Sequence, residues 1–427
     1  MGHLGKGHSP HQHLQQRFDR MVTGAPDSPV FMQILQLLYS DAEAELARRI
    51  PARPTSLRKL ARTLGKDPKT LQDILIPMAE RGVLVDFEAN GETYVLLPPV
   101  VIGFFEMVFM RARDGLPMKE LAELFEAYMG QDERFARDVF GGPTQLSRSL
   151  VREEALEGAD FSEVLDWERA SRLIEDATDV GVSLCACRHE AEHLGRACDA
   201  PMEACLMLDS SVDHLARHGM ARRISKREGM RILEQCKEAG LAQTGDNVQR
   251  EIGYICNCCG CCCGQMRAIK QFDMPHAIVS SNWIMEIDSE KCRGCGLCAK
   301  ACPVDVIDMV ASGQEKPAKR AEVGTERCLG CGVCYQACHF GAMHMRSREK
   351  RVFTPENLYE RVISMALERG KLTDLLIDDP ESLSYRTIGR VLRVLEKSPP
   401  ARALMAIQPL KSVFMKTLIK AARLPKG

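Results

Sequence analysis

The stretch CRGCGLCAKACP, residues 292–303, recurs as CLGCGVCYQACH at residues 328–339. Both copies place four cysteines in the spacing C-x2-C-x2-C-x3-C. Three thiolates in so short a loop can cover three corners of an iron–sulfur cubane, and the fourth ligand then comes from elsewhere. Structural zinc sites favour paired C-x2-C knuckles and do not need the third, evenly spaced cysteine. The repeat therefore favours iron–sulfur chemistry over zinc.

Residues 283–346, which contain the repeat, resemble a bacterial-type ferredoxin with two [4Fe-4S] clusters. As in that family, the strand-like sequences WIMEID and RAEVGTE precede the two runs. The fourth cysteine of each run in such domains ligates the other cluster. The resemblance therefore implies one cluster on Cys292, Cys295, Cys298 and Cys338, and a second on Cys328, Cys331, Cys334 and Cys302. Pro303 follows the first run, whereas His339 stands where the family usually has a second proline.

The composition of the whole chain is that of a soluble globular protein with an unusual number of cysteines. The chain has 427 residues, 27% charged, with a formal net charge of -1, which makes no global case for nucleic-acid or membrane binding. Its apolar stretch YVLLPPVVIGFF has twelve residues and two prolines, against the ~20 residues that span a bilayer. We expect no transmembrane segment and a reducing, cytoplasmic location, where nineteen cysteines indicate metal rather than disulfides.

A second group of cysteines precedes the repeat, in CACRHEAEHLGRACDAPMEAC at 185–205 and ICNCCGCCCG at 255–264. Residues 218–247, between these segments, have the pattern of a helical hairpin. Cys236 lies in its apolar periodicity, so we interpret it as a core thiol. Ten thiolates remain, which exceed the need of one cubane and could serve two. These candidate ligands are Cys185, Cys187, Cys198 and Cys205, which form a possible quartet, and Cys256, Cys258, Cys259, Cys261, Cys262 and Cys263.

The cysteines of residues 256–263 would alternate between two sides of an extended chain. Cys256, Cys258 and Cys262 would then share one side, unless Gly260 bends the segment. Adjacent cysteines in an extended chain are poorly placed to ligate the same ion, which favours a segment between two centres or a redox-active spare thiol. Iron–sulfur ligation is our hypothesis, and closed tetrahedral zinc sites remain the alternative. Near the quartet, Arg188, His189 and His193 could tune a centre or be ordinary surface charge.

The whole arrangement is similar to a little-characterised group of ferredoxin-type iron–sulfur proteins from anaerobic bacteria and archaea. The similarity covers residues from about 18 to 410 and rests on ILIPMAERGVL, the segment CACRHE…C…PMEAC, the run ICNCCGCCC and the dicluster repeat. The letters CCG at 258–260 also occur in the cluster motif of heterodisulfide reductase subunits, although the wider spacing differs. The resemblance implies electron transfer in anaerobic metabolism and no defined reaction.

The predicted fold class is mainly α with small β elements, an α+β chain. Helical periodicity predicts helices in 28–50, 55–65 and 67–84, with Thr55 or Ser56 as the N-cap of the second and Asp67 as that of the third. Asn90-Gly91 predicts a hairpin after them. This order resembles a winged helix. The predicted divisions are a flexible tail 1–27, a winged-helix-like domain 28–100, a helical linker region 101–180, a cysteine-rich metal-binding region 181–270, a ferredoxin domain 283–346 and a helical C-terminal region 350–427.

Binding of the winged-helix-like region to DNA is disfavoured, because Lys66 and Lys69 are accompanied by Asp67, Asp73 and Glu80. We expect it to dock a partner or pack on its own chain. The final stretch LKSVFMKTLIKAARLPKG has the pattern of a basic amphipathic helix for packing, for a partner or for a membrane surface.

The predicted function is an electron carrier with two [4Fe-4S] clusters and one or two further iron–sulfur centres. It would serve a redox protein or enzyme partner, with no nucleic-acid partner. Two alternatives stay open: a reductase subunit that binds substrate at the upstream cysteines, and a redox-sensing regulator. The sequence contains neither a G-x-G-x-x-G motif after a predicted strand nor a Walker A motif, so it offers no support for nucleotide binding.

Overall fold

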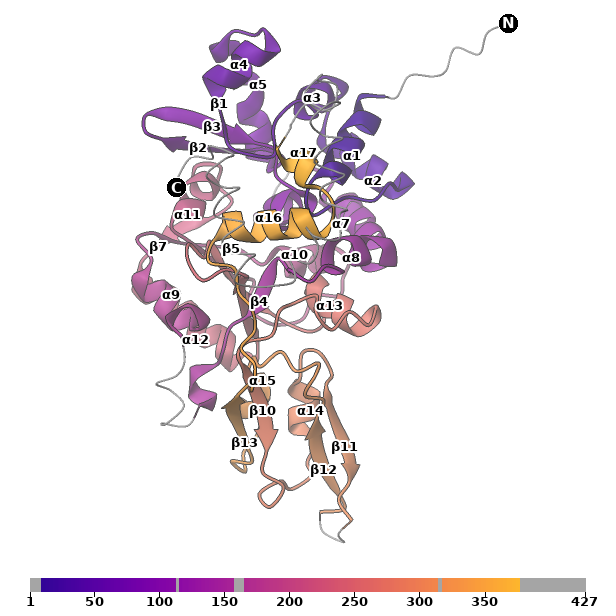
Figure 1. Ribbon diagram of the computed structural model, residues 1–427, viewed down its shortest axis with the longest axis vertical. Helices are drawn as coiled ribbons and strands as arrows, with labels where there is room; N and C mark the ends of the chain where they lie inside the picture. Colours follow the sequence, from indigo (N-terminus) through magenta and orange to yellow (C-terminus); the bar gives the residue numbers. More distant parts are fainter. Residues whose placement is uncertain (1–8, 113–114, 157–164, 314–316, 377–427) are drawn as a thin grey trace, which may run out of the picture. The chain divides into compact units, whose positions relative to one another are not determined.

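The computed structural model describes residues 9–112, 115–156, 165–313 and 317–376 (Figure 1). The chain divides into two compact units. The first contains Met1–Phe105, Gly142–Thr144 and Glu356–Gly427, and the second contains Glu106–Gly141 and Gln145–Pro355. Both cysteine-rich segments therefore belong to the second unit.

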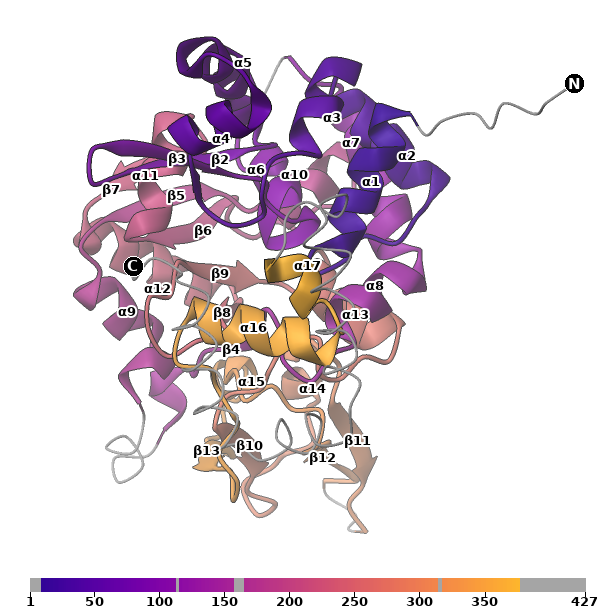
Figure 2. The same cartoon turned by 45° about the horizontal axis from the view of Figure 1, so that its top comes forward.

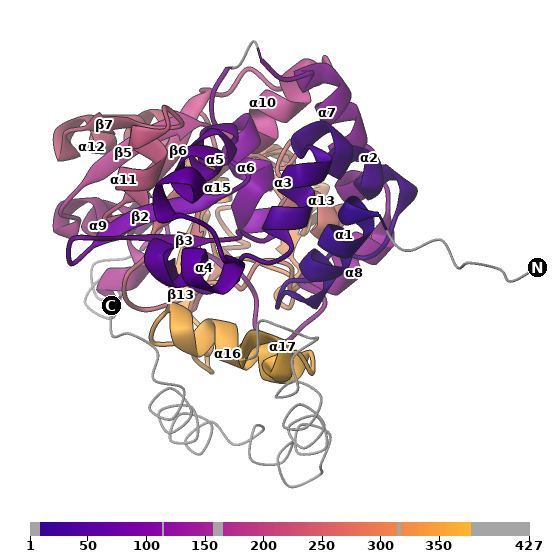
Figure 3. The ribbon, with the colours of Figure 1, turned by 90° about the horizontal axis from the view of Figure 1, so that it is seen from above.

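The first unit is built from short helices and one small sheet. Figure 3 shows α1, α2 and α3 close together, and α1 contacts both of the others. The strands pair antiparallel in the order β1-β3-β2. Its elements are α1 (Pro10–Arg20), α2 (Pro29–Leu38), α3 (Asp41–Ala47), β1 (Thr55–Ser56), α4 (Leu57–Leu64), α5 (Pro68–Arg81), β2 (Val85–Ala89), β3 (Glu92–Leu96), α16 (Leu358–Glu368) and α17 (Leu372–Leu376).

The predicted caps and turn are observed in this unit. The Ser56 hydroxyl caps α4, which ends at Gly65 in the left-handed region. Asp67 caps α5 by accepting a hydrogen bond from the Thr70 amide. Asn90 and Gly91, with φ of 52° and 73°, form the turn between β2 and β3, as a two-residue hairpin with two positive φ angles requires. The winged-helix likeness of this module stays a prediction.

The flexible tail predicted for residues 1–27 is wrong for residues 10–20, which form α1. Ser9 caps this helix, and Leu14 and Phe18 are buried, four residues apart on one face. The Phe18 ring lies 5.2 Å from the ring of Phe104 and 6.1 Å from that of Phe31, measured between centroids. Burial of this apolar face orders a segment whose polar composition suggested a solvated tail.

The second unit contains a six-stranded antiparallel sheet in the order β4-β8-β9-β6-β5-β7 (Figure 2). Helices α9 and α12 pack together, and α12 contacts β5 and β6. The strands are β4 (Ser147–Ser149), β5 (Val180–Leu184), β6 (Glu203–Leu208), β7 (Arg222–Ile224), β8 (Ala242–Asp246) and β9 (Tyr254–Cys258). The helices are α6 (Phe105–Phe109), α7 (Met118–Phe125), α8 (Glu133–Phe140), α9 (Ala170–Asp176), α10 (Ala186–His193), α11 (Ser210–Arg217), α12 (Lys226–Glu238) and α13 (Gly264–Gln271).

This sheet was not predicted, and it corrects the interpretation of the segment before the second cysteine run as a helical hairpin. Residues 218–247 instead contain β7, α12 and β8. Cys236 is fully buried on α12 in the core with Ile232 and Leu233, which confirms its interpretation as a core thiol. The class α+β holds, but the cysteine-rich region is built on a sheet larger than the small β elements expected.

The ferredoxin-like segment consists of two two-stranded antiparallel sheets and two short helices (Figure 1). β10 (Trp283–Ile287) pairs with β13 (Met343–Ser347), and β11 (Ile307–Ala311) pairs with β12 (Lys319–Val323). The strands expected at WIMEID and RAEVGTE are thus observed. The helices α14 (Leu297–Ala301) and α15 (Val333–Gln336) each begin within a cysteine run.

The basic amphipathic helix expected at the end of the chain lies outside the described residues. Within the described ranges, no helix combines the length and the apolarity that crossing a bilayer requires.

A buried ion pair joins distant parts of the second unit. Arg148 on β4 and Glu168 are 0% and 1% exposed, and a guanidinium nitrogen lies 3.1 Å from the carboxylate. Arg148 also donates to the Thr354 hydroxyl, and the Asn282 amide donates to Glu168. Because both charges are buried, each depends on the other for its stability.

We therefore expect Glu168→Gln to lower the free energy of unfolding by about 3–5 kcal/mol, because it leaves the buried Arg148 without its anion. Anaerobic urea unfolding followed by circular dichroism measures this loss. Asp166→Asn is the control: its side chain is 69% exposed, and surface ion pairs contribute about 0–1 kcal/mol. Equal effects of the two substitutions would contradict the assigned role of the buried pair.

Candidate metal centres

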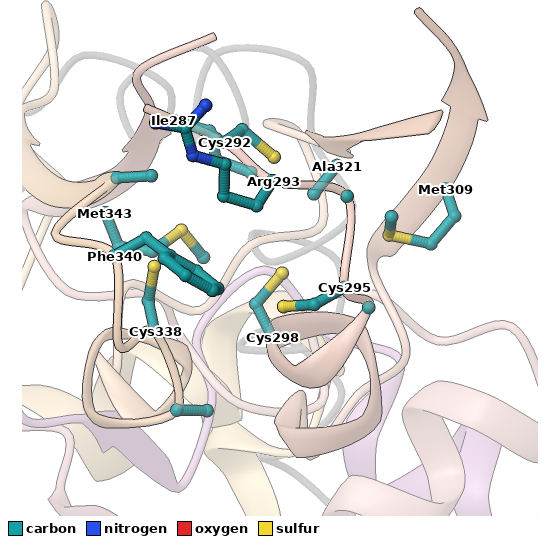
Figure 4. Close-up of a pocket in the computed structure, with 14 residues that line it drawn as sticks. Ile287, Cys292, Arg293, Cys295, Cys298, Met309, Ala321, Cys338, Phe340 and Met343 are labelled. Carbon is teal, nitrogen blue, oxygen red and sulfur yellow. The ribbon is translucent and has the colours of Figure 1, made fainter. Parts of the chain in front are cut away.

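The eight cysteines of the repeat line two separate cavities. Figure 4 shows the sulfur atoms of the first set around a shared space. The first cavity is lined by Cys292, Cys295, Cys298 and Cys338. The second is lined by Cys302, Cys328, Cys331 and Cys334. Each set thus contains three cysteines of one run and the last cysteine of the other, which is the grouping that the ferredoxin resemblance implies.

Two glycines at matching positions of the runs allow this wrapping. Gly294 and Gly330 have φ of +67° and +63°, backbone angles that residues other than glycine rarely adopt. A Cβ atom at Gly294 would lie 2.1 Å from the carbonyl oxygen of Lys319, and one at Gly330 would lie 2.1 Å from that of Trp283. Each run is therefore held directly against the backbone of a neighbouring strand.

The chemistry of these thiols fits metal binding. Burial raises the pKa of Cys331 to about 12, and it raises the pKa of Cys334 well above the ordinary value. As free thiols both groups would stay protonated at neutral pH, whereas a bound metal ion deprotonates its coordinating thiols outright. Four such sulfur donors around a small cavity are a suitable ligand set for an iron–sulfur cluster.

The ten upstream cysteines form two groups rather than one. The four-cysteine group consists of Cys198, Cys259, Cys261 and Cys262, whose sulfur atoms all lie within 4.8 Å of one another. The sulfurs of Cys198 and Cys259 are 3.6 Å apart, and those of Cys261 and Cys262 are 3.7 Å apart. The group is close to the surface, since Cys261 is exposed.

The six-cysteine group consists of Cys185, Cys187, Cys205, Cys256, Cys258 and Cys263. These residues come from the start of α10, from β6 and β9, and from the cap of α13. The sulfurs of Cys205 and Cys256 lie 3.8 Å apart. Hydrogen bonds also join Cys187 to Cys263, and Cys258 to Cys256 and Cys263. The group has more sulfur donors than one cluster requires.

The thiols of these groups are strongly perturbed by one another. Hydrogen bonds from Cys256 and Cys263 lower the pKa of Cys258 to about 6, although burial opposes them. A hydrogen bond from Cys262 and the charge of Arg188 lower the pKa of Cys259 to about 3, again against burial. One thiolate in each group is therefore favoured at neutral pH, and such thiolates are the metal-binding form of cysteine.

The predicted quartet is not a unit, because Cys198 lies in the four-cysteine group while the other three lie in the six-cysteine group. The predicted alternation holds only along β9, where Cys256 and Cys258 lie in the same group. After Cys258 the chain turns at residues 260–262. This bend brings the adjacent Cys261 and Cys262 together and separates Cys262 from Cys258, against the expectation for an extended segment.

Arg188 is fully buried on α10 and is not ordinary surface charge. It donates to the carbonyl oxygens of Pro201 and Asn257, at 2.5 and 3.4 Å, and lies 3.7 Å from the Cys259 sulfur. Burial lowers the pKa of Arg188, but the Cys185 and Cys259 thiolates outweigh it and raise that pKa above the ordinary value. The guanidinium is thus the counter-charge for buried thiolates.

Among the described residues, no hydrogen bond joins either of the two histidines near the predicted quartet to a cysteine sulfur. His189 is buried and its Nδ1 lies 2.7 Å from the carbonyl oxygen of Phe109, and the ring of His193 lies 4.8 Å from that of His189. Burial lowers the pKa of His193. Both rings therefore help to hold α10 in place.

A carboxylate that the sequence did not single out joins the elements that carry the six-cysteine group. Glu126 accepts hydrogen bonds from both ends of the Arg267 guanidinium, at 2.7 and 2.6 Å, and from Arg196 at 2.6 Å. Arg267 lies on α13, shortly after Cys263, and Arg196 follows α10. Sequence spacing gives no signal for this contact, because Glu126 is 141 residues from Arg267.

The turn after β9 packs directly on the ferredoxin-like segment. A Cβ atom at Gly260 would lie 2.2 Å from the carbonyl oxygen of Pro303, which follows Cys302. Only glycine allows this approach without a backbone shift. The upstream cysteines and the second ferredoxin set therefore meet at one contact.

Comparison with known proteins supports the same chemistry. Residues 291–342 match the family model of the 4Fe-4S dicluster domain. The chain is also 26% identical over 224 residues to one component of the Na(+)-translocating ferredoxin:NAD(+) oxidoreductase complex of Acetobacterium woodii. The similar region covers 52% of this chain and 57% of that component, so the chain spans little more than half of its relative. No solved structure matches the chain.

The grouping around the two cavities makes the ligand assignment testable. The second set consists of Cys302, Cys328, Cys331 and Cys334. We expect Cys302→Ser to damage the cluster of this set more than the cluster of the first set. The reason is that the Cys302 side chain lines only the second cavity. Mössbauer and EPR spectra of wild type and variant measure this selectivity, with Cys338→Ser as the mirror-image control. Selective loss of the first cluster in Cys302→Ser would overturn the assignment.

Proposed function

We propose that this ferredoxin-type iron–sulfur protein carries single electrons between a redox partner and a further iron–sulfur centre held by the six-cysteine group. The observation that carries the proposal is the arrangement of the cysteines. Two complete sets surround paired cavities, and the upstream turn lies against the residue that follows Cys302. When bound, iron–sulfur clusters supply one-electron transfer at potentials that the protein sets through burial, charge and hydrogen bonds to sulfur.

The surroundings of the two ferredoxin sets differ, which supports a direction of approach for the partner. Cys295 of the first set is exposed, and Phe340, which lines the same cavity, is 48% exposed. Leu297, between Cys295 and Cys298, is 40% exposed. The cysteines of the second set are all buried. We assign the partner contact to the first set, because exposed apolar side chains beside a redox centre are suited to transient docking.

The six-cysteine group is proposed as the ligand set of one additional cluster. Its members are buried or half-buried, and they come from four elements that meet around the start of β9 and α13. Four of the six can bind a cubane, and the remaining two would stay as thiols next to it. Arg188 and the Glu126–Arg267 pair hold the elements that carry them.

We infer the kind of redox partner from the similar protein of Acetobacterium woodii. That protein is part of an oxidoreductase complex named for ferredoxin and NAD(+). We infer that this chain also serves an anaerobic redox enzyme or complex, in a reducing cytoplasm. The winged-helix-like module is proposed as a docking or packing element and not as a DNA-binding one.

Metal and electron counts test the proposal. Anaerobically purified full-length protein should contain about twelve cluster irons, four for each of three cubanes, and take up about three electrons from dithionite. We assign Cys205, which is buried on β6, to the four ligands of this cluster. We therefore expect Cys205→Ser to lower these values to about eight irons and two electrons. Cys236→Ala is the control, since this core thiol belongs to neither group. Eight irons in the wild type would refute the third cluster.

The contact at Gly260 gives a separate test of the connection between the regions. We expect Gly260→Ala to slow electron exchange between the ferredoxin clusters and the upstream centre at least several-fold, because the added methyl group must push the turn away from Pro303. Freeze-quench EPR after rapid reduction measures this exchange. Gly264→Ala, where an added Cβ meets open space, is the matched control and should behave as wild type. Unchanged exchange in Gly260→Ala would contradict the proposed connection.

A further inference from the structure

We propose that the four-cysteine group, Cys198, Cys259, Cys261 and Cys262, binds a single tetrahedral metal ion, zinc or ferrous iron, and not a cluster. This site is separate from the six-cysteine group and goes beyond the electron carrier proposed above. Its evidence is the spacing of the sulfurs, the local backbone and the buried charge beside them.

The sulfur spacing is that of ligands to one ion. A zinc–sulfur bond of about 2.3 Å places the corners of a tetrahedron about 3.8 Å apart. The measured separations are 3.6 Å for Cys198–Cys259 and 3.7 Å for Cys261–Cys262, and all four sulfurs lie within 4.8 Å of one another. The cysteines of a cubane instead bind four different irons, which holds their sulfurs further apart. In the six-cysteine group only single pairs are close, such as Cys205 and Cys256 at 3.8 Å, and among the described residues no three of its sulfurs lie within 4.8 Å of one another.

The backbone explains why these sulfurs stay close. Cys259, Cys261 and Cys262 lie on one turn, which the hydrogen bond from the Cys263 amide to the Cys259 carbonyl closes at 3.3 Å. Three ligands among four consecutive residues cannot spread around a cubane as the three cysteines of residues 292–298 do. Cys198, from the loop after α10, completes the set across 61 residues of sequence.

The charge near the group supports a divalent ion. Four thiolates and one divalent cation carry a net charge of −2, which a buried site must balance. The fully buried Arg188 lies 3.7 Å from the Cys259 sulfur, and its other hydrogen-bond acceptors are the backbone carbonyls of Pro201 and Asn257. Among the described residues, no carboxylate pairs with this guanidinium, and the Cys259 sulfur of the four-cysteine group lies within hydrogen-bond distance of it.

A bound ion here would fasten the turn after β9 to the loop after α10. Closing this interval with a metal restricts the unfolded chain as a cross-link does, so binding energy becomes folding energy. The same ion would hold Gly260 in its close approach to Pro303. Cys261 is exposed, which leaves a path from solvent for the ion.

Metal analysis of the anaerobic full-length protein tests the proposal. We expect one ion per chain beyond the cluster irons, either zinc or a tetrahedral FeS4 iron with its own Mössbauer signature. If the ion is zinc, X-ray absorption at the zinc edge should show sulfur neighbours at about 2.3 Å and no iron neighbour. This measurement needs no variant, so it does not depend on a substituted chain folding.

Cys198→Ser and Cys205→Ser separate this site from the proposed cluster. We expect Cys198→Ser to lose the single ion and keep all cluster irons, and Cys205→Ser to show the reverse. Loss of about four irons in Cys198→Ser would overturn the proposal, as would a wild type with no additional ion or with a Cys261–Cys262 disulfide. Failure of the third cluster would appear instead in the iron count with the single ion still present.

Discussion

The upstream region depends on one buried cation, the guanidinium of Arg188. A charge withdrawn from water is stable only beside opposite charge and hydrogen-bond acceptors. Arg188 has both, because it lies 3.7 Å from the Cys259 sulfur and donates to the carbonyls of Pro201 and Asn257. The thiolate of Cys185, in the other group, also raises its pKa. The Arg188 side chain thus interacts with thiols of both groups. It also joins strand β9, through Asn257, to the loop that contains Pro201.

Strand β9 and the turn after it divide a nearly continuous run of cysteines between two sites. The side chains of Cys256 and Cys258 belong to the six-cysteine group, whereas the intervening Asn257 donates to the Ala204 carbonyl and accepts from Gln243. Pairing therefore fixes which face of β9 holds sulfur. At Gly260 the chain leaves the strand, and the next cysteines join Cys198. Adjacent residues serve different centres because the backbone changes direction between them.

Features encoded in short segments could be predicted from the sequence, and features that depend on distant pairing could not. The ferredoxin resemblance implied the grouping of cysteines that lines the two cavities and the strands before the two runs. The predicted caps, Thr55 or Ser56 and Asp67, indicated where two helices begin. The grouping of Cys198 with Cys259 required contact across 61 residues. The six-stranded sheet was missed because its strands have only three to six residues. The role of Arg188 stayed open between tuning a centre and ordinary surface charge, since sequence alone does not reveal burial.

The contact between Gly260 and Pro303 gives the tetrathiolate site an electrostatic consequence for its neighbour. Cys259 and Cys261 flank Gly260, and Cys302 precedes Pro303, so ligands of two centres are separated by one backbone contact. The negative charge of the proposed site, which the Arg188 cation beside it offsets only in part, would disfavour the addition of an electron nearby. Burial strengthens that effect because the surroundings are less polar than water. The second ferredoxin set would then have a lower reduction potential than the more exposed first set. Its sulfurs also receive amide hydrogen bonds, such as that from Gly330 to Cys328 at 3.4 Å, which act in the opposite sense. If the proposed ion is bound, the difference in potential between the two sets would therefore depend on the turn as well as on the cysteine repeat itself.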